Sequence, residues 1–384
     1  MTPGTSQTPD TLRPGDTCWR VERAERMAPL VENATYFRAL KAALEKAERQ
    51  VMILGWNFDA RTVLEPNERG EPTTPDGRIG ELLKRLSAER PELEIRILIW
   101  RAAFPIVATQ GGYPVRAIRD FKGTRIRFRL QRVTAIGACH HQKVVVIDDQ
   151  VAFCGGGDIS VDRWDSSEHL DVDGRRIMPN GKAHVPRHEV MSVVSGPAAG
   201  ALGDLFRSRW EHTAKEALAP PTPPSGDVWP AHVEPLLLDV PLGVARTHPV
   251  HGGRGGVSEI ERLHLAAIGG ARERIYIENQ YLASPLIETA LARRLQDPTG
   301  PEVVLVTTWK SPSWFDQMTM DRTRAALVGR LRAADVFGRF RAYCPKTAGG
   351  DGIIVHCKVA VIDDELLRIG SANLNNRSFG FDTE

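Results

Sequence analysis

The chain has 384 residues, a length that allows two or three domains. Hydrophobic residues make up 42% and charged residues 26%, which excludes a disordered, collagen-like or coiled-coil protein. The formal charge of +2 is too small to favour strong nonspecific nucleic-acid binding. No apolar run approaches the ~20 residues of a membrane helix, and no secretory signal is evident, so we expect a cytoplasmic or peripheral membrane protein. The five cysteines form no CxxC pair, which gives no indication of a disulfide framework or thiolate metal site.

Proline and glycine divide the chain into segments. Residues 1–16 are rich in Pro, Thr and Gly and are expected to form a flexible tail. Four prolines lie within residues 220–224 and stop both helices and central strands, so we interpret residues 217–235 as a linker or a surface strap. The expected units are therefore residues 17–216 and residues 236–384.

Buried strands and amphipathic helices alternate on both sides of the linker, a pattern typical of α/β packing. Helices are predicted at Tyr36–Arg49 and Val257–Ala271. Strand segments of the first unit have counterparts of similar pattern in the second: Glu48–Phe58 with Glu273–Leu282, Leu93–Trp100 with Pro301–Trp309, and Ile126–Gln131 with Phe340–Pro345.

The clearest correspondence joins His141–Asp158 (HQKVVVIDDQVAFCGGGD) to His356–Asn373 (HCKVAVIDDELLRIGSAN), with 8 identities in 18 ungapped positions. One α/β unit is thus used twice, about 215 residues apart. The plainer interpretation is two independent copies of a common sheet scaffold. Strand patterns recur freely, but paired His, Lys, Asp and Gly do not, and they favour true duplication.

Each copy carries the pattern His-x-Lys-x4-Asp. On a strand, residues two apart share a face, so His141 and Lys143 should point the same way, as should His356 and Lys358. Asp148 and Asp363 lie an odd number of positions from their histidines, at a turn. We therefore expect these two carboxylates to fix the turn by accepting hydrogen bonds rather than to take part in catalysis.

Two His–Lys pairs suit the cleavage of a phosphodiester. A neutral imidazole can attack phosphorus and form a phosphohistidine. A second, protonated imidazole can donate to the leaving alkoxide, which contributes ~10²–10⁴ in rate. Two ammonium groups can neutralise the nonbridging oxygens, a contribution of ~3–4 kcal/mol for a preorganised donor. Because lysines supply this charge, we expect no metal and no cofactor to be required for the chemistry.

With these motifs the chain resembles the phospholipase D superfamily, which is defined by the duplicated pattern. The resemblance runs roughly from Gly15 to Glu384. It includes the GSAN and NNRS segments after the second motif, the IENQY segment, and PRHEVMSVVSGPAAGALGDLFRSRW, in which Arg187 replaces the usual Trp and Glu189 the usual Asp. It implies an α/β fold of two pseudo-twofold-related α/β/α sandwich repeats, whose mixed β-sheets share one active-site cleft.

The resemblance also implies roles for single residues. In the family an acidic residue after each motif accepts a hydrogen bond from the catalytic His, the role of the third member of a triad. By position we assign Glu189 to His141 and Glu384 to His356. Because the family continues with a strand at this point, we expect the chain to be truncated at Glu384, with an incomplete second sheet and a less well oriented His356. In relatives the first-repeat His is the nucleophile, so His141 would attack and His356 would act as acid and then base, although the near-symmetry of the motifs leaves the roles open.

Further residues are expected to contact the substrate. Asn373 would contact the phosphate, with Ser371 in the same GSAN segment and Asp158 as the counterpart of Asn373 in the first repeat. Trp56 and Gln280 end matching strands that should point at the cleft, where they would shape the headgroup pocket.

The favoured function is a phosphodiesterase or phosphatidyltransferase that cleaves glycerophospholipid headgroups at a membrane surface, acting as a monomer. A cardiolipin-synthase-like transferase is a variant of the same chemistry. A nuclease or oligonucleotide phosphodiesterase would use the same four residues, but it needs a basic track with stacking aromatics, and aromatics are only 7% of this chain. A catalytically inactive sensor of anionic lipid is the alternative from outside the enzymes.

Overall fold

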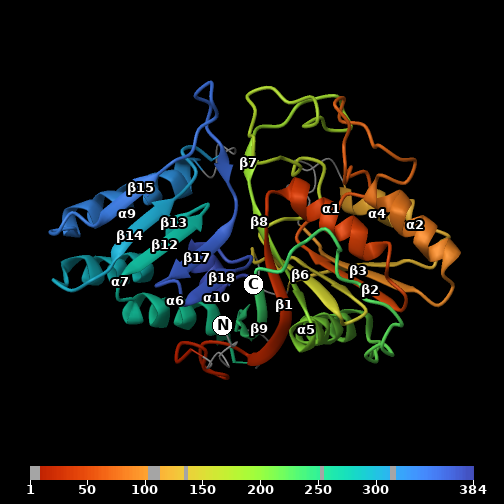
Figure 1. Cartoon of the computed structure of the whole chain (residues 1–384), viewed down its shortest axis with the longest axis horizontal. Helices are drawn as coiled ribbons and strands as arrows, with labels where there is room; N and C mark the ends of the chain where they lie inside the picture. Colours follow the sequence, from red (N-terminus) through yellow and green to blue (C-terminus); the bar gives the residue numbers. More distant parts are fainter. Residues whose placement is uncertain (1–8, 103–112, 134–136, 251–254, 312–316) are drawn as a thin grey trace.

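The computed structural model describes residues 9–102, 113–133, 137–250, 255–311 and 317–384 (Figure 1). Two mixed β-sheets form its two halves. The first sheet has the order β4-β3-β2-β5-β6-β8-β1-β9. Its strands are β1 (Arg20–Val31), β2 (Gln50–Gly55), β3 (Glu94–Trp100), β4 (Arg127–Gln131), β5 (Val144–Ile147), β6 (Val151–Gly155), β8 (Val190–Ser195) and β9 (Leu237–Val244).

The second sheet has the order β15-β14-β12-β17-β18. Its strands are β12 (Arg274–Asn279), β14 (Glu302–Val306), β15 (Phe340–Tyr343), β17 (Lys358–Ile362) and β18 (Leu366–Ile369). This order repeats β4-β3-β2-β5-β6, with the same parallel and antiparallel pairings between corresponding neighbours. The predicted α/β fold with two related mixed sheets is confirmed.

Helices cover both faces of the first sheet. On one face lie α1 (Asn33–Leu44), α2 (Ile79–Glu89) and α4 (Tyr113–Asp120), which bury side chains such as Phe37, Leu40 and Leu83. On the other lies α5 (Pro197–Ala214), packed through Leu202, Phe206 and Trp210. These apolar residues recur at helical spacing, which is why each helix presents one buried stripe.

Helices of the second half lie on one face of its sheet. They are α6 (Glu259–Gly270), α7 (Pro285–Gln296) and α9 (Arg322–Ala334), preceded by the π-helical turn η1 (Gln317–Asp321). The opposite face turns Val359, Val361, Leu367 and Ile369 toward β8 of the first half, where they pack with Val190. Figure 1 shows β8 and β18 beside the junction of the two halves.

The proline-rich segment lies against the first half as a strap. Val228 and Trp229 are buried in the first core, and Lys46 Nζ donates to the Trp229 carbonyl at 2.6 Å. The strand that follows, β9, pairs with β1 and joins the first sheet. Residues 236–384 were expected to form the second unit. The strand β9 near the start of this range instead extends the first sheet.

The ends of the chain also pack at the junction. Leu12 is buried with Cys18 and Leu263, so the segment expected to form a tail contacts both halves within its described part. The remaining short elements are β7 (Arg187–His188), β10 (Thr247–His248), β11 (Val257–Ser258), β13 (Leu282–Ala283), β16 (Ile354–Val355), β19 (Leu374–Asn375) and α10 (Asn376–Gly380). Across the described ranges, no helix combines the length and apolar character needed to cross a bilayer.

Candidate active site

Each motif histidine lies just before a strand of its own half, and its backbone bonds to the other half. His141 precedes β5, and its backbone N–H donates to the Thr383 carbonyl at 2.8 Å. His356 lies between β16 and β17, and its N–H donates to the His188 carbonyl at 2.8 Å. The prediction that each His-x-Lys lies within a strand of its own sheet is wrong for both histidines, whose backbones pair with the opposite half, and for Lys143, which precedes β5.

This pairing exchanges the carboxylates between the halves. His141 Nδ1 lies 3.0 and 2.9 Å from the two carboxylate oxygens of Glu384. His356 Nδ1 lies 3.0 and 2.9 Å from those of Glu189. The sequence-based assignment of Glu189 to His141 and Glu384 to His356 is therefore wrong: each half supplies the acid for the histidine of the other.

Strand register explains the exchange. β7 and β16 pair in parallel and align His188 with Val355, so the residues that follow, Glu189 and His356, come together. In the same way, the parallel bridge between His140 and Thr383 brings His141 beside Glu384. The arrangement is the same at both places, as a pseudo-twofold relation requires.

Glu384 is held by more than His141. Ser378 Oγ donates to its Oε1 at 2.6 Å, and Gln142 Nε2 donates to its backbone oxygen at 2.8 Å. The expectation of a poorly oriented His356 is also wrong, because His356 depends on Glu189, which β7 and β8 fix from the first half.

The two lysines are buried beside the histidines. Lys143 Nζ donates to the His141 carbonyl at 2.7 Å and lies 3.4 Å from Asp158 Oδ2. Lys358 Nζ donates to the His356 carbonyl. Asp158 also accepts from the backbone N–H groups of Trp56 and Asn57 at 2.9 and 3.0 Å. This placement makes Asp158 the counter-ion of Lys143.

A glycine lets the two halves approach closely. A Cβ on Gly156 would lie 2.5 Å from Glu189 Oε1 and 2.9 Å from the His356 carbonyl, closer than side chains tolerate. The GGGD segment of the first repeat therefore packs directly on the second motif, where any larger side chain would displace Glu189.

Cations surround His356. Burial, together with Lys358, Arg163, Arg187 and Lys143, holds the pKa of His356 well below its usual range. Burial is also the largest reason that the pKa of Lys358 falls to about 7, and Lys143 adds to it. Because lysines from both halves affect these values, the two motifs share one electrostatic environment.

For the carboxyl group of Glu384, the neighbouring positive charges outweigh the effect of burial on the pKa. Burial raises the pKa of this carboxyl group, but His141 and Lys143 more than offset it and bring the pKa to about 2. Glu384 is therefore ionised at neutral pH and can stabilise a positive charge on His141.

The other predicted residues do not all lie beside the histidines, because Asp148 and Asp363 follow the far ends of β5 and β17. Asp148 accepts from the backbone N–H groups of residues 48–50, and Asp363 from those of residues 272–274, which is the turn-fixing position that the spacing predicts. Ser371 is buried beside Glu384, and Asn373 is buried with its backbone N–H donating to Ser378 Oγ at 3.0 Å. Trp56 stacks on Trp100 with centroids 5.7 Å apart, and Gln280 is buried and donates to the Tyr281 hydroxyl.

Three residues near the motifs were not assigned a role from the sequence. Arg163 and Arg187 are buried and act electrostatically on His356, and Ser378 donates to Glu384. Burial, with Arg163 close by, lowers the pKa of Arg187 to about 10. In the sequence, the presence of Arg187 where the family that the chain resembles usually has Trp was the signal for a positive charge at this position.

A cavity of about 800 Å³ adjoins the site between the two sheets. Lys143, Ser371 and Glu384 form part of its wall. Most of the remaining wall is aliphatic and comes from both halves, including Val190, Leu242, Val359, Leu367 and Ile369. Leu236 and Leu237 line it as well and are exposed to solvent. The buried polar group thus lies beside a large apolar space.

Comparisons with known proteins show what this chain is similar to. A family profile described as "Cardiolipin synthase, PLD-like domain" matches residues 265–384. Phospholipase D alpha 4 of Arabidopsis thaliana is 27% identical over 62% of this chain and 37% of its own length. Phospholipase D A of Dictyostelium discoideum is 25% identical over 89% of this chain and 31% of its own length. The chain therefore spans only about a third of the length of these relatives.

Among solved structures, the phosphatidylserine synthase of Haemophilus influenzae Rd KW20 is similar, with a TM-score of 0.59 and 13% identity, over 95% of this chain and 82% of the other. At this identity the similarity shows the fold alone.

The exchanged carboxylates can be tested without substrate. Glu189→Gln removes the negative charge beside His356, so the pKa of His356 should fall further while the ¹⁵N resonances of His141 stay unchanged. Glu384→Gln should have the reverse effect. The measurement is a pH titration of the imidazole nitrogens by ¹⁵N NMR. A Glu189→Gln variant that changes His141 and leaves His356 unaltered would contradict the exchange.

Proposed function

Because the chain belongs to the phospholipase D superfamily, we propose that it cleaves phosphodiesters of glycerophospholipids through a covalent phosphohistidine and passes the phosphatidyl group to water or an alcohol. The observation that carries the proposal is the convergence of two His–carboxylate pairs and two buried lysines, drawn from both halves. This set provides a nucleophile, a proton donor and charge for the nonbridging oxygens.

In the first step, the neutral His141 attacks phosphorus through Nε2. A P–N bond forms and the P–O bond to the headgroup alcohol breaks. Glu384 holds Nδ1–H and stabilises the positive charge that the ring acquires. His356 gives its Nε2 proton to the leaving oxygen, so that the headgroup departs as a neutral alcohol. Lys143 and Lys358 neutralise the nonbridging oxygens.

In the second step, His356 removes a proton from water or from an alcohol, and the resulting oxygen nucleophile attacks phosphorus. The P–N bond breaks and returns the electron pair to His141. Water gives a phosphatidic acid and an alcohol gives a new phosphatidyl ester. Both reactions restore the starting protonation states, with no metal, oxidant or other co-reactant required for the proton and bond balance.

The charge around His356 bears on its role. Burial and neighbouring cations favour a neutral ring before substrate binds. A phosphodiester brings negative charge to these cations, which raises the pKa of His356 and lets it hold the proton that it must donate. We therefore propose that substrate binding prepares His356 to act as the acid.

The apolar cavity supports a lipid substrate. Its aliphatic wall meets Lys143 and Ser371, so an acyl chain could lie in it while the phosphate contacts Lys143; His141, His356 and Lys358 lie outside this wall. Exposed Leu236 and Leu237 at the same cavity suit contact with a lipid surface. A nucleic-acid strand would instead need a charged groove with stacking aromatics. The family profile keeps the cardiolipin-synthase type of transfer as a variant of this proposal.

The substrate class can be tested with phosphatidylcholine vesicles, with and without ethanol, beside single-stranded DNA. We expect choline release, and phosphatidylethanol when ethanol is present. His141→Ala and His356→Ala should each lower turnover by at least ~10³-fold, whereas the buried neighbour Cys357→Ala should retain it. Cleavage of DNA alone would favour the nuclease, and inertness toward both substrates would favour a lipid sensor.

The covalent step predicts a trapped intermediate. The reaction is stopped rapidly during turnover without the use of acid. Mass spectrometry of the resulting peptides should then locate the phosphoryl group on His141. The His356→Ala variant should accumulate it with a nitrophenyl diester, whose good leaving group needs no proton donor. Modification of His356 in the wild-type protein would reverse the two roles.

The lowered pKa of Lys358 predicts a pH dependence. A lysine is charged below its pKa, so with a nitrophenyl diester kcat/KM should fall as the pH rises through about 7. Bound phosphate stabilises the charged lysine, so the corresponding fall in kcat should occur at a higher pH. Lys358→Arg, which stays charged, should remove the fall near pH 7 even if its maximal rate is lower. An unchanged profile in Lys358→Arg would contradict this assignment.

A further inference from the structure

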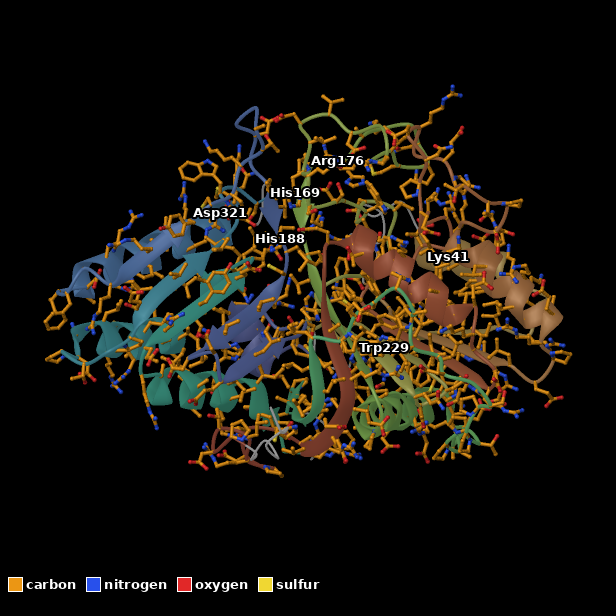
Figure 2. The ribbon with its side chains drawn as sticks, in the orientation of Figure 1. Lys41, His169, Arg176, His188, Trp229 and Asp321 are labelled. Carbon is orange, nitrogen blue, oxygen red and sulfur yellow. The ribbon has the colours of Figure 1, made fainter. Side chains whose placement is uncertain are left out.

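A second cluster of polar side chains, formed by Glu32, His169 and His188, lies next to Glu189. His169 and His188 come from the loop after β6 and from β7, and Figure 2 shows both at the junction of the two halves. Their rings are nearly perpendicular, with centroids 6.1 Å apart. Glu32 lies between them: its Oε1 is 3.1 Å from His169 Nε2 and 2.5 Å from His188 Nδ1. The three donor atoms lie within 4.8 Å of one another.

The far nitrogen of each ring is also held by a carboxylate. His169 Nδ1 lies 2.9 Å from Asp165 Oδ2, and His188 Nε2 lies 3.0 Å from Glu278 Oε2. A carboxylate on the far nitrogen is the arrangement that orients metal-binding histidines and raises their basicity. Here both histidines have it, and the carboxylates come from different halves of the protein.

The side chains of this group carry two more negative charges than positive charges when the imidazoles are neutral. Glu32, Asp165 and Glu278 contribute −3, and Arg176, which lies 3.5 Å from Asp165, contributes +1. With neutral imidazoles the group carries a net charge of −2. Two protons on the histidines would balance it, and so would one divalent cation.

We propose that Glu32, His169 and His188 bind one divalent transition-metal ion, of which zinc fits best. Two imidazole nitrogens and one carboxylate oxygen form a ligand set that zinc prefers, with a fourth position left for water. Bonds of about 2.1 Å in a tetrahedral site place donor atoms about 3.4 Å apart, so the three side chains need only small shifts to accept the ion.

A competing group shares His188. It consists of His188, Glu278 and Cys357, whose sulfur lies 3.1 Å from Glu278 Oε2. There, Glu278 also accepts a hydrogen bond from the Tyr276 hydroxyl, and a metal would have to break this bond and the one from the Cys357 thiol. In the group with Glu32 these contacts stay in place, and Glu278 remains the partner of the far nitrogen of His188.

The proposed ion would act on the active site through the backbone of Glu189. Glu32 N–H donates to the Glu189 carbonyl at 2.8 Å, and Glu189 N–H donates to Glu32 Oε2 at 3.1 Å. Glu32 thus offers one oxygen to the ion and the other to the residue that orients His356. The ion would have a structural role and would not contact the phosphate, so the inference does not depend on the proposed reaction.

The test is metal retention by the full chain. The protein is stripped with a chelator, incubated with zinc and desalted, and bound metal is measured by mass spectrometry. We expect one zinc per chain in the wild type and less than a tenth of that in His169→Ala. The exposed His232 provides the matched control, and His232→Ala should retain zinc. Excess zinc should also raise the Tm of the wild type by at least about 3 °C and leave that of His169→Ala unchanged.

Cobalt(II) absorption of the wild-type protein gives a second measurement that does not depend on a variant folding correctly. We expect visible d–d bands without a sulfur-to-metal charge-transfer band. A charge-transfer band that is lost in Cys357→Ala would overturn the proposal in favour of the group with Cys357. Wild-type zinc retention no higher than that of His169→Ala, or retention of calcium in place of zinc, would also overturn it. None of these measurements requires turnover, so they can fail or succeed independently of the proposed reaction.

Discussion

The hydrogen bond between each motif histidine and a carboxylate of the opposite half is the interaction on which the site depends. Nδ1 of His141 is held by Glu384, and Nδ1 of His356 by Glu189. Neither half could orient its own histidine in isolation. The packing of Val190 against Val355 and Val359 therefore has a catalytic consequence, because a small shift between the sheets would move both carboxylates relative to their rings.

Positive charge is the second constraint. Lys143, Lys358, Arg163 and Arg187 are all buried close to His356, and burial lowers the pKa of Lys358 to about 7 and that of Arg187 to about 10. The folded protein thus holds cations in an environment that disfavours their charge. A phosphate group relieves this repulsion, and the charges need no rearrangement at the moment of reaction. Such preorganisation is a general source of transition-state stabilisation.

Local sequence patterns predicted the parts of the fold that depend on local periodicity. The strands at Leu93–Trp100 and Phe340–Pro345, the duplicated order of the sheets and the turn carboxylates Asp148 and Asp363 all follow from alternation and spacing. The exchange of Glu189 and Glu384 did not, because it is set by contacts between residues 167 and 243 positions apart. Two acids that each follow a motif suggest pairing within a repeat, and only the register of β7 with β16 and of Thr383 with His140 reverses it.

The two carboxylates differ in a way that bears on the near-symmetry of the motifs. Glu384 accepts from the Ser378 hydroxyl as well as from His141, which takes up part of its negative charge. In the described part of the chain, the carboxylate of Glu189 receives its side-chain hydrogen bond from His356, and its backbone is fixed by Glu32. The charge of Glu189 also acts on the buried cations Lys358 and Arg187, so each carboxylate is shared with a different set of groups. We propose that a bound phosphodiester offsets these cations, which would let Glu189 hold the protonated ring of His356 and leave His141 to attack phosphorus.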